Sequence, residues 1–265
     1  MARAIWSGSV SFGLVNVPVK LFSAVSSKAV SFHQLSRQDR ARIRQKRVSS
    51  TTGDEVAYEN IVKGYELAPG QYVVVTPEEL EGLDPEASRT IDIEDFVDLD
   101  RIDPIYFDRP YYLAPSGQGA AKPYRLLVEA MGATNKVAIA TFVMRTKQYL
   151  AALRAKDGVL LLSTMHYADE IVPVEQIDGV PATDVEVRER ELAMATQLVE
   201  SLSTVFDPDK YQDEYRMRVL ELIERKAAGE DVVVPSAVAE PSQVVDLMSA
   251  LEDSLEAARQ RQQAG

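Results

Sequence analysis

The spacing of the apolar residues changes once along the chain, and this change constrains the fold more than any other feature. From Trp6 to about Pro181, apolar residues recur mostly at every second position, as in β-strands with one buried face. Beyond Pro181 they recur every three or four positions, as in amphipathic helices. Strands first and helices last predict an α+β protein with a β core and a helical extension.

The strand-forming part favours a closed sheet. Residues 137–144 are apolar on both faces, which suits a barrel or a covered sheet better than an open one. Apolar positions are even from Trp6 to Leu14 and odd from Val15 to Leu21, so the chain must bulge or bend between these runs. Asp157-Gly158 between two apolar runs predicts a two-residue hairpin turn. Further strands are expected at residues 71–76, 90–97, 111–114, 136–145, 149–156 and 159–165.

Helices are expected once among the strands and three times after them. The caps expected are Gly132 and Gly229 at C-termini, and a capping box formed by Thr183 and Glu186. Residues 230–241 contain two prolines and read as a linker. The expected helices cover residues 123–131, a stretch that begins near Thr183, about 211–228 and about 242–262.

Composition excludes several classes of protein. The 265 residues include no cysteine, which removes disulfides, thiol catalysis and cysteine metal sites. The two histidines, His33 and His166, leave little room for a histidine-built metal centre. No run approaches the roughly 18 apolar residues that a membrane-spanning helix needs. Ser7, Ser9 and Ser11 interrupt the apolar residues near the N-terminus, so we expect no signal peptide and a cytoplasmic protein.

Charge is unevenly distributed, although the net charge is −12. Residues 1–50 carry nine basic residues and one acidic residue, whereas residues 51–100 carry two basic and fourteen acidic residues. Binding of phosphates depends on a local positive field, so the acidic total does not exclude nucleic acid. The densest positive group, here called the basic cluster, consists of Arg37, Arg40, Arg42, Arg44, Lys46 and Arg47.

The basic cluster predicts contacts with phosphates. Arg42, Arg44 and Lys46 alternate, so in an extended segment they point to one side about 7 Å apart. Phosphates along one DNA strand repeat at roughly the same distance. The alternative is a solvated charged loop. The cluster contains no interleaved aromatic residues, which argues against a base-stacking single-strand site.

An acidic run supports the alternative hypothesis of a metal-dependent nuclease. However, Ile91, Ile93 and Phe96 alternate with the acids as the inner face of a strand does, and the run lacks the glycine of a calcium loop. These features favour the other interpretation, in which the acids are the solvated edge of a strand. We find no hydrolase, kinase or redox motif, so we expect a binding protein with no catalytic residues, cofactor or metal. The acids of this run are Asp92, Glu94, Asp95, Asp98, Asp100 and Asp103.

Several short segments, in order along nearly the whole chain, resemble one family. They are Phe12-Gly-Leu-Val-Asn-Val-Pro-Val19, Phe32-His-Gln34, Arg42-Ile-Arg-Gln-Lys-Arg47, Phe107-Asp-Arg109, Leu150-Ala-Ala-Leu-Arg154, Tyr167-Ala-Asp-Glu170, Glu191-Leu-Ala-Met-Ala195, Phe206-Asp-Pro208 and Leu220-Glu-Leu-Ile-Glu224. Together they resemble bacterial Ku, the DNA-end-binding family of nonhomologous end joining. The resemblance implies a homodimer of antiparallel β-barrels whose bridge segments close a ring around double-stranded DNA ends. It also implies recruitment of a DNA ligase D-type polymerase–ligase, and a place at the nucleoid.

Two departures from the family pattern matter. Many relatives carry a Cys-x-x-Cys pair just after the basic segment, and Ser49 and Thr52 stand there in this chain, so we expect no metal at that turn. Many relatives also continue into a lysine-rich tail. This chain stops at Gly265, so we expect DNA affinity or bridging that depends on such a tail to be missing.

The last expected helix carries a narrow apolar seam. Its residues are spaced four, three, four and three apart, a two-in-seven repeat. A helix behind a linker can dock into a partner's groove, and the resemblance favours the ligase as partner; folding back onto the parent dimer is the alternative. The seam consists of Val244, Met248, Leu251, Leu255 and Ala258. The expected domains are a barrel with its bridge at 1–181, a dimerising helical arm at 182–229, the linker at 230–241 and the partner-binding helix at 242–265.

Overall fold

The computed structural model describes residues 3–82, 89–145, 147–181, 185–230 and 247–264. The chain divides into two compact units, residues 1–28 with 33–176, and residues 29–32 with 177–265. The division after Gln176 lies near the boundary expected at residue 181, and the expected linker falls almost wholly outside the described residues. Among the described residues, no helix is long and apolar enough to cross a bilayer.

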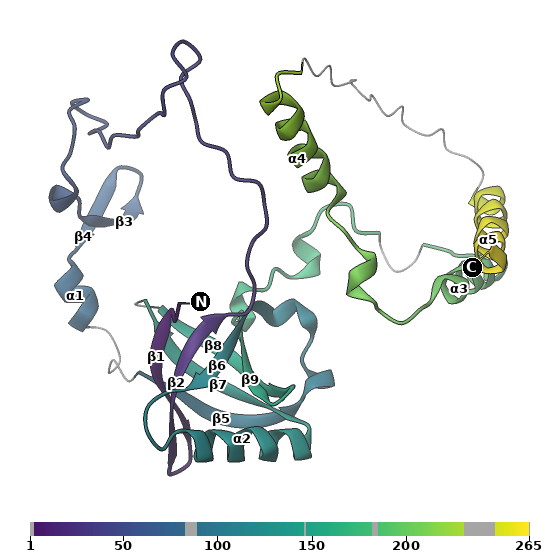
Figure 1. Ribbon diagram of the computed structural model, residues 1–265, viewed down its shortest axis with the longest axis horizontal. Helices are drawn as coiled ribbons and strands as arrows, with labels where there is room; N and C mark the ends of the chain where they lie inside the picture. The colour runs from purple at the N-terminus through teal and green to yellow at the C-terminus, as the bar shows by residue number, and fades with distance from the viewer. Residues whose placement is uncertain (1–2, 83–88, 146, 182–184, 231–246, 265) are drawn as a thin grey trace. The chain divides into compact units, whose positions relative to one another are not determined.

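Seven strands of the first unit close into a barrel in the order β1-β2-β6-β9-β8-β7-β5 (Figure 1). This confirms the α+β fold with a β-barrel core. Neighbouring strands are antiparallel except β1 and β5, which pair in parallel, so the expectation of a wholly antiparallel barrel was wrong at this one seam. The barrel strands are β1 (Trp6–Phe12), β2 (Val15–Ser23), β5 (Thr90–Asp98), β6 (Phe107–Pro115), β7 (Lys136–Met144), β8 (Lys147–Lys156) and β9 (Val159–Met165).

The pairing of β1 brings both ends of a long excursion to one end of the barrel. Trp6 of β1 faces Leu21 of the antiparallel β2, and Ser9 faces Thr90 of the parallel β5. The end of β2 and the beginning of β5 therefore both lie beside the N-terminal half of β1. Residues 24–89, here called the excursion, connect these two strands. The excursion must therefore leave the barrel and return to it at the same end.

The parallel seam requires a glycine in β1. The Ser9 N–H donates to the Arg89 carbonyl across a distance of 2.8 Å. A Cβ at Gly8 would lie 2.0 Å from the same carbonyl oxygen and 2.3 Å from the ring of Trp6. Only glycine permits so close an approach of backbone and ring. The indole N–H of Trp6 in turn donates to the Val143 carbonyl at 3.0 Å, which ties β1 to β7 across the barrel.

Two hairpin turns follow the sequence prediction. The change of phase after Leu14 is a bend, because Phe12 pairs with Val15 and Gly13 takes the left-handed conformation at φ +59°. At the second turn, Asp157 and Gly158 have φ values of +52° and +78°, as the favoured two-residue hairpin requires. Local turn chemistry therefore sets both of these reversals.

Helix α2 (Ala121–Thr134) lies across one end of the barrel (Figure 1). The expectation that Gly132 ends this helix was wrong, because Gly132 is inside it. Asn135 is the left-handed residue, at φ +51°, and its N–H donates to the Gly132 carbonyl. Asn tolerates this conformation better than other residues that carry a Cβ, so it replaces glycine as the terminator here.

Tyr124 connects α2 to the barrel core. Its side chain is buried, and its hydroxyl donates to the Leu113 carbonyl at 2.7 Å and accepts from the Leu160 N–H at 2.9 Å. Leu113 of β6 and Leu160 of β9 are themselves a cross-strand pair. One hydroxyl therefore satisfies two backbone groups of neighbouring strands. The rest of the core is apolar and includes Val10, Val17, Val19, Leu21, Ile91, Phe142, Leu153 and Leu162.

The excursion between β2 and β5 has no core of its own. Its regular elements are the hairpin of β3 (Lys63–Ala68) and β4 (Gln71–Val75), followed by α1 (Pro77–Gly82). The side chains that the structure describes between residues 24 and 80 include no buried one. The sequence predicted β4 but not its partner β3, because Lys63, Gly64 and Glu66 dilute the apolar alternation of that segment.

The second unit is helical. The helix expected near Thr183 begins later, at Glu189, where the Glu191 carboxylate accepts from the Arg188 N–H at 3.1 Å; Thr183 lies outside the described residues. Gly229 has φ +85° just beyond the third helix of the sequence prediction, as expected of a terminator. The helices are α3 (Glu189–Leu202), α4 (Glu214–Ala227) and α5 (Leu247–Ala264).

Replacing Tyr124 by Phe should destabilise the barrel by about 1–3 kcal/mol, because the Leu160 N–H and the Leu113 carbonyl would lose a buried partner. Urea unfolding followed by tryptophan fluorescence measures the change. Tyr112→Phe is the matched control, since Tyr112 lies on β6 with its side chain exposed. Equal midpoints for Y124F and the wild-type protein would contradict this role.

Candidate nucleic-acid interface

The basic cluster begins on a narrow turn. Leu35 and Arg42 form an isolated antiparallel bridge, and the Ser36 N–H donates to the Ala41 carbonyl at 2.8 Å. Inside the turn, the Ser36 hydroxyl and the Ala41 N–H donate to the carboxylate of Asp39, which lowers the pKa of Asp39. The one acid among the basic residues is thus used to shape the loop that carries them.

A second turn follows the basic cluster. Val48 and Glu55 form its bridge, and the Ser49 N–H donates to the Asp54 carbonyl at 2.8 Å. The Ser49 hydroxyl accepts from the Thr52 N–H at 3.4 Å, and the Thr52 hydroxyl accepts from the Asp54 N–H at 3.3 Å. Hydrogen bonds from Ser49 and Thr52, which stand in the places of the family's cysteine pair, therefore stabilise this turn.

The structure divides the basic cluster into two groups. Lys46 forms an ion pair with Glu55 at 2.5 Å, and the guanidinium of Arg47 lies 5.1 Å from the centre of the Tyr58 ring. Both cations thus have partners inside the excursion. Among the described residues, no ion pair involves the other four members of the basic cluster, and all four are exposed. These four, here called the free arginines, are Arg37, Arg40, Arg42 and Arg44.

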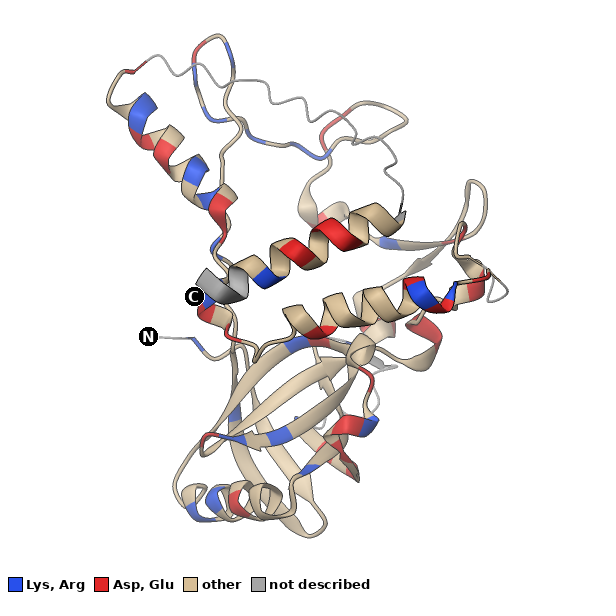
Figure 2. Cartoon of the chain, turned by 90° about the vertical axis from the view of Figure 1, so that its right-hand side faces the viewer, with Lys and Arg blue, Asp and Glu red and all other residues tan. Residues whose placement is uncertain are grey.

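The free arginines can meet an extended polyanion. Residues 43–47 run without helix or strand between the two turns, and Figure 2 shows basic residues recurring along this part of the excursion. Arginine presents a planar fork of donors that matches phosphate oxygens, and exposed guanidinium groups need no rearrangement to reach them. The arrangement suits contact with a sugar–phosphate backbone, which fixes position without reading sequence.

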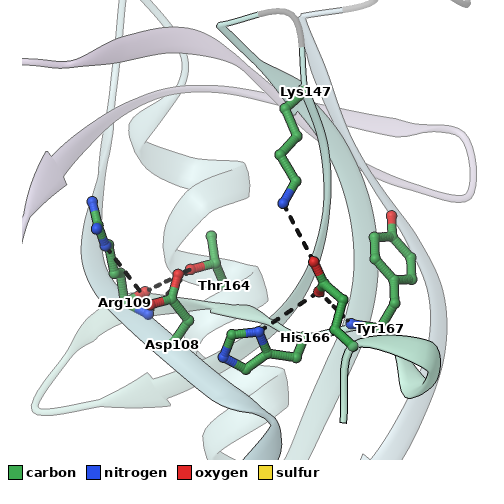
Figure 3. Close-up of polar contacts among 7 residues, drawn as sticks. Asp108, Arg109, Lys147, Thr164, His166 and Tyr167 are labelled. Carbon is green, nitrogen blue, oxygen red and sulfur yellow. Dashed lines mark hydrogen bonds and ion pairs between the residues drawn. The ribbon is translucent and has the colours of Figure 1, made fainter. Parts of the chain in front are cut away.

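A second group of cations lies on the barrel, and sequence reasoning missed it. β6 and β9 pair at Phe107–Met165 and again at Pro110–Ser163, so Asp108 and Arg109 together oppose Thr164 in a bulge. The buried Thr164 hydroxyl accepts from the Arg109 N–H at 3.1 Å and contacts the Asp108 carboxylate at 3.2 Å (Figure 3). The bulge holds the Arg109 side chain outward, 75% exposed.

Lys147 begins β8 near this bulge. Its ammonium lies 5.4 Å from the centre of the Tyr149 ring. The same ammonium lies 3.6 Å from a carboxylate oxygen of Glu170 (Figure 3). The Tyr167 N–H, which donates to the Glu170 carboxylate at 2.9 Å, is the main cause of the lowered pKa of Glu170, with Lys147 and His166 adding to it. The sequence analysis did not mark Lys147, and it included Arg109 only in a segment that carries the resemblance, because these basic residues are isolated from one another along the chain.

The acids of the nuclease hypothesis lie on β5 and just beyond it. Asp98 pairs with Lys136 at 2.7 Å, Glu94 accepts from the Thr141 hydroxyl at 2.8 Å, and Asp103 accepts from the Ile105 N–H at 2.9 Å. Within the described ranges, no group of three or more His, Asp or Glu residues is placed to hold a metal ion. Three of the six acids thus have structural partners instead.

The apolar seam of the last helix faces α3. α5 packs against α3, with Leu255 and Ala258 buried and Met248 and Leu251 half-buried (Figure 2). Arg190 of α3 reaches Glu252 of α5 at 3.4 Å. Val244 lies outside the described residues. The structure thus places the seam in contact with the protein's own helix.

The structure defines a β-barrel protein that carries four exposed arginines on a long loop, and comparison with known proteins gives the family. The family model described as the Ku70/Ku80 beta-barrel domain matches residues 11–194. The non-homologous end joining protein Ku of Anaeromyxobacter sp. is 54% identical over 262 residues, covering 98% of this chain and 88% of that protein. The non-homologous end joining protein Ku 1 of Saccharopolyspora erythraea is 48% identical over 259 residues, covering 98% and 80%. The chain belongs to the Ku family.

The solved structures that match include the SPOC domain of human PHD-finger protein 3. The match covers 62% of this chain and 95% of that domain's chain, with 12% identity and a TM-score of 0.31. A likeness at this level carries no argument about site or function, which rest here on the family and on the chain's own residues.

The division of the basic cluster predicts unequal contributions to DNA binding. Replacing Arg42 and Arg44 by Ala should reduce the slope of log affinity against log salt by about 0.9 for each lost phosphate contact. Replacing Lys46 and Arg47 should change the slope less, because Glu55 and Tyr58 already engage those cations. Fluorescence anisotropy with a short duplex over a salt series measures both slopes. Equal losses from the two pairs would contradict the division.

Proposed function

We propose that this protein binds the ends of double-stranded DNA breaks without sequence specificity and acts in nonhomologous end joining at the nucleoid. Membership of the Ku family supports the role. The observation that carries the proposal is the set of four exposed arginines without ion pairs, on a loop anchored at both ends to one end of the barrel. Such groups bind phosphates of any sequence, and a closed loop can receive duplex DNA only through a free end.

The ring is completed by a second copy of the chain. Apolar side chains that one copy leaves exposed support this dimer. Tyr58, Tyr65 and Tyr72 of the excursion are 78%, 68% and 60% exposed, and Leu192 and Val199 of α3 are 60% and 67% exposed. Large apolar surfaces of this kind mark protein–protein contacts. The helical arm and the excursion are therefore the surfaces through which two copies associate.

The protein acts by binding and performs no cleavage. Three of the six acids that a nuclease could use are engaged by Lys136, Thr141 and the Ile105 N–H. Two-metal phosphodiester cleavage needs carboxylates that converge on ions about 3.5–4 Å apart. The proposed contribution to repair is instead to hold the DNA end and bring an enzyme to it.

The enzyme is a DNA ligase D-type polymerase–ligase, and α5 is the proposed docking element. Its seam follows the spacing of helices that dock into an apolar groove. Since Leu255 and Ala258 are buried against α3, α5 must leave α3, or rotate on it, before the seam can meet the ligase. The two contacts use the same residues and exclude each other.

Affinity for linear duplex and for covalently closed circles of the same sequence should differ strongly, because a ring cannot thread onto a circle. Electrophoretic mobility shift at matched salt gives both affinities. Equal affinity for the two forms would rule out the ring.

Two controls belong to this comparison. Cutting the circle once should restore full binding. Sedimentation of the same preparation should give a dimer, since an exposed apolar excursion and arm need a partner to cover them; a stable folded monomer at micromolar concentration would contradict the dimer.

Deleting residues 242–265 should abolish stimulation of the ligase and leave end binding intact, because the seam is removed and the basic cluster is untouched. Joining of blunt linear DNA by the purified polymerase–ligase measures stimulation, and the shift assay measures end binding. Full stimulation by the truncated protein would show that α5 is not the docking element.

A further inference from the structure

A recess opens on the barrel where the excursion begins. Its volume is about 550 Å³, and Ser23, the last residue of β2, and Val25, at the start of the excursion, form part of its wall. The recess therefore lies at the end of the barrel to which both ends of the excursion are anchored. A ligand that contacts the first residues of the excursion would also meet this recess.

Three cations line the recess, and one acid accompanies them. Arg109 comes from the bulge of β6, and Arg145 and Lys147 come from the turn and strand that follow β7. Asp108 is the acid in the lining. The bulge of β6 and the β7–β8 turn thus bring positive charge together at a place where the sequence has no basic run.

The ion pairs at this recess are loose. The Arg109 guanidinium is 3.7 Å from the Asp108 carboxylate, and the Lys147 ammonium is 3.6 Å from the Glu170 carboxylate. Both distances exceed those of hydrogen bonds, and the two cationic side chains are 75% and 58% exposed. An oxygen of a bound anion can therefore approach either cation while its carboxylate partner stays in place.

The backbone at Arg145 also points to a role for its side chain. Met144 pairs with Lys147, so Arg145 lies in a tight turn and has φ +54°. Turns of this kind favour Asn, Asp or Gly, and arginine there is strained. Tyr111 and Tyr149 line the recess between these cations and add phenol hydroxyls. Burial raises the pKa of Tyr111, so its hydroxyl keeps its proton and remains a donor.

We propose that this recess is a phosphate-binding site, in which Arg109, Arg145 and Lys147 hold one phosphate group. The proposal rests on the proposed function, since the ligand expected first is a backbone phosphate of the duplex that the basic cluster also contacts. Two cationic surfaces at one end of the barrel would hold the strand at two points, on the loop and on the sheet. A free phosphorylated compound has the same chemistry and is the other source.

The test compares the salt dependence of duplex binding for the Arg109→Gln/Lys147→Gln variant and for Lys156→Gln. Lys156 is an exposed lysine at the opposite end of β8. Its replacement removes one positive charge and the double variant removes two, so the two changes in slope are compared per charge removed. The double variant should lower the salt slope by about 0.9 for each lost contact, and K156Q should leave it unchanged. The charge-preserving variant Arg109→Lys/Lys147→Arg should retain most of the slope, and thermal unfolding confirms that each variant is folded.

A second arm uses inorganic tripolyphosphate without DNA, with NMR shifts of the recess residues as the readout. A reduced slope for the double variant identifies the DNA backbone as the source of the phosphate. An unchanged slope with shifts of the recess residues identifies a free phosphorylated compound. An unchanged slope without such shifts overturns the site. Loss of end-dependent binding by the wild-type protein would instead overturn the proposed function, so the two failures are distinguishable.

Discussion

The parallel pairing of β1 with β5 is the constraint on which the rest of the structure depends. This pairing closes the barrel. Because β1 also pairs with β2, the chain that leaves the barrel after β2 returns to it beside the same strand, β1. A Cβ at Gly8 would meet the Arg89 carbonyl at 2.0 Å, so the seam is possible only with glycine. The long excursion is a loop with fixed ends for this reason, and such a loop suits the ring that we propose.

The charges of the excursion show how a net-acidic chain can still present a surface to DNA. Lys46 and Arg47 stabilise the excursion itself through Glu55 and Tyr58, while the free arginines remain available. Asp39 shapes the loop that carries them. The same division occurs on the barrel, where Thr164 anchors the bulge and Arg109 extends from it. In both places a local hydrogen-bonded frame holds cations outward, and the phosphate contacts that we propose follow from that frame.

Exposed apolar side chains are distributed along the chain as unevenly as the charged residues are. The barrel buries the apolar side chains of its core, Tyr124 among them. The excursion and α3 instead leave large apolar side chains exposed. α5 covers one face of α3 through Leu255 and Ala258. The large apolar side chains that remain exposed are the basis for the association with a second copy that we propose. Because α3 contacts the seam of α5, a partner can bind the seam only after α5 leaves α3 or rotates on it.

The sequence alone determined what depends on near neighbours. Alternating apolar residues predicted most of the strands, and Asp157-Gly158 predicted the turn between two of them. The basic cluster was visible as a run of arginines. All three are local properties of the sequence. The tertiary structure decided what depends on distant residues: the parallel seam of β1, the termination of α2 at Asn135 rather than Gly132, and the placement of Arg109 and Lys147 around one recess. These choices follow from packing and register summed over the whole barrel, which no short window of sequence contains.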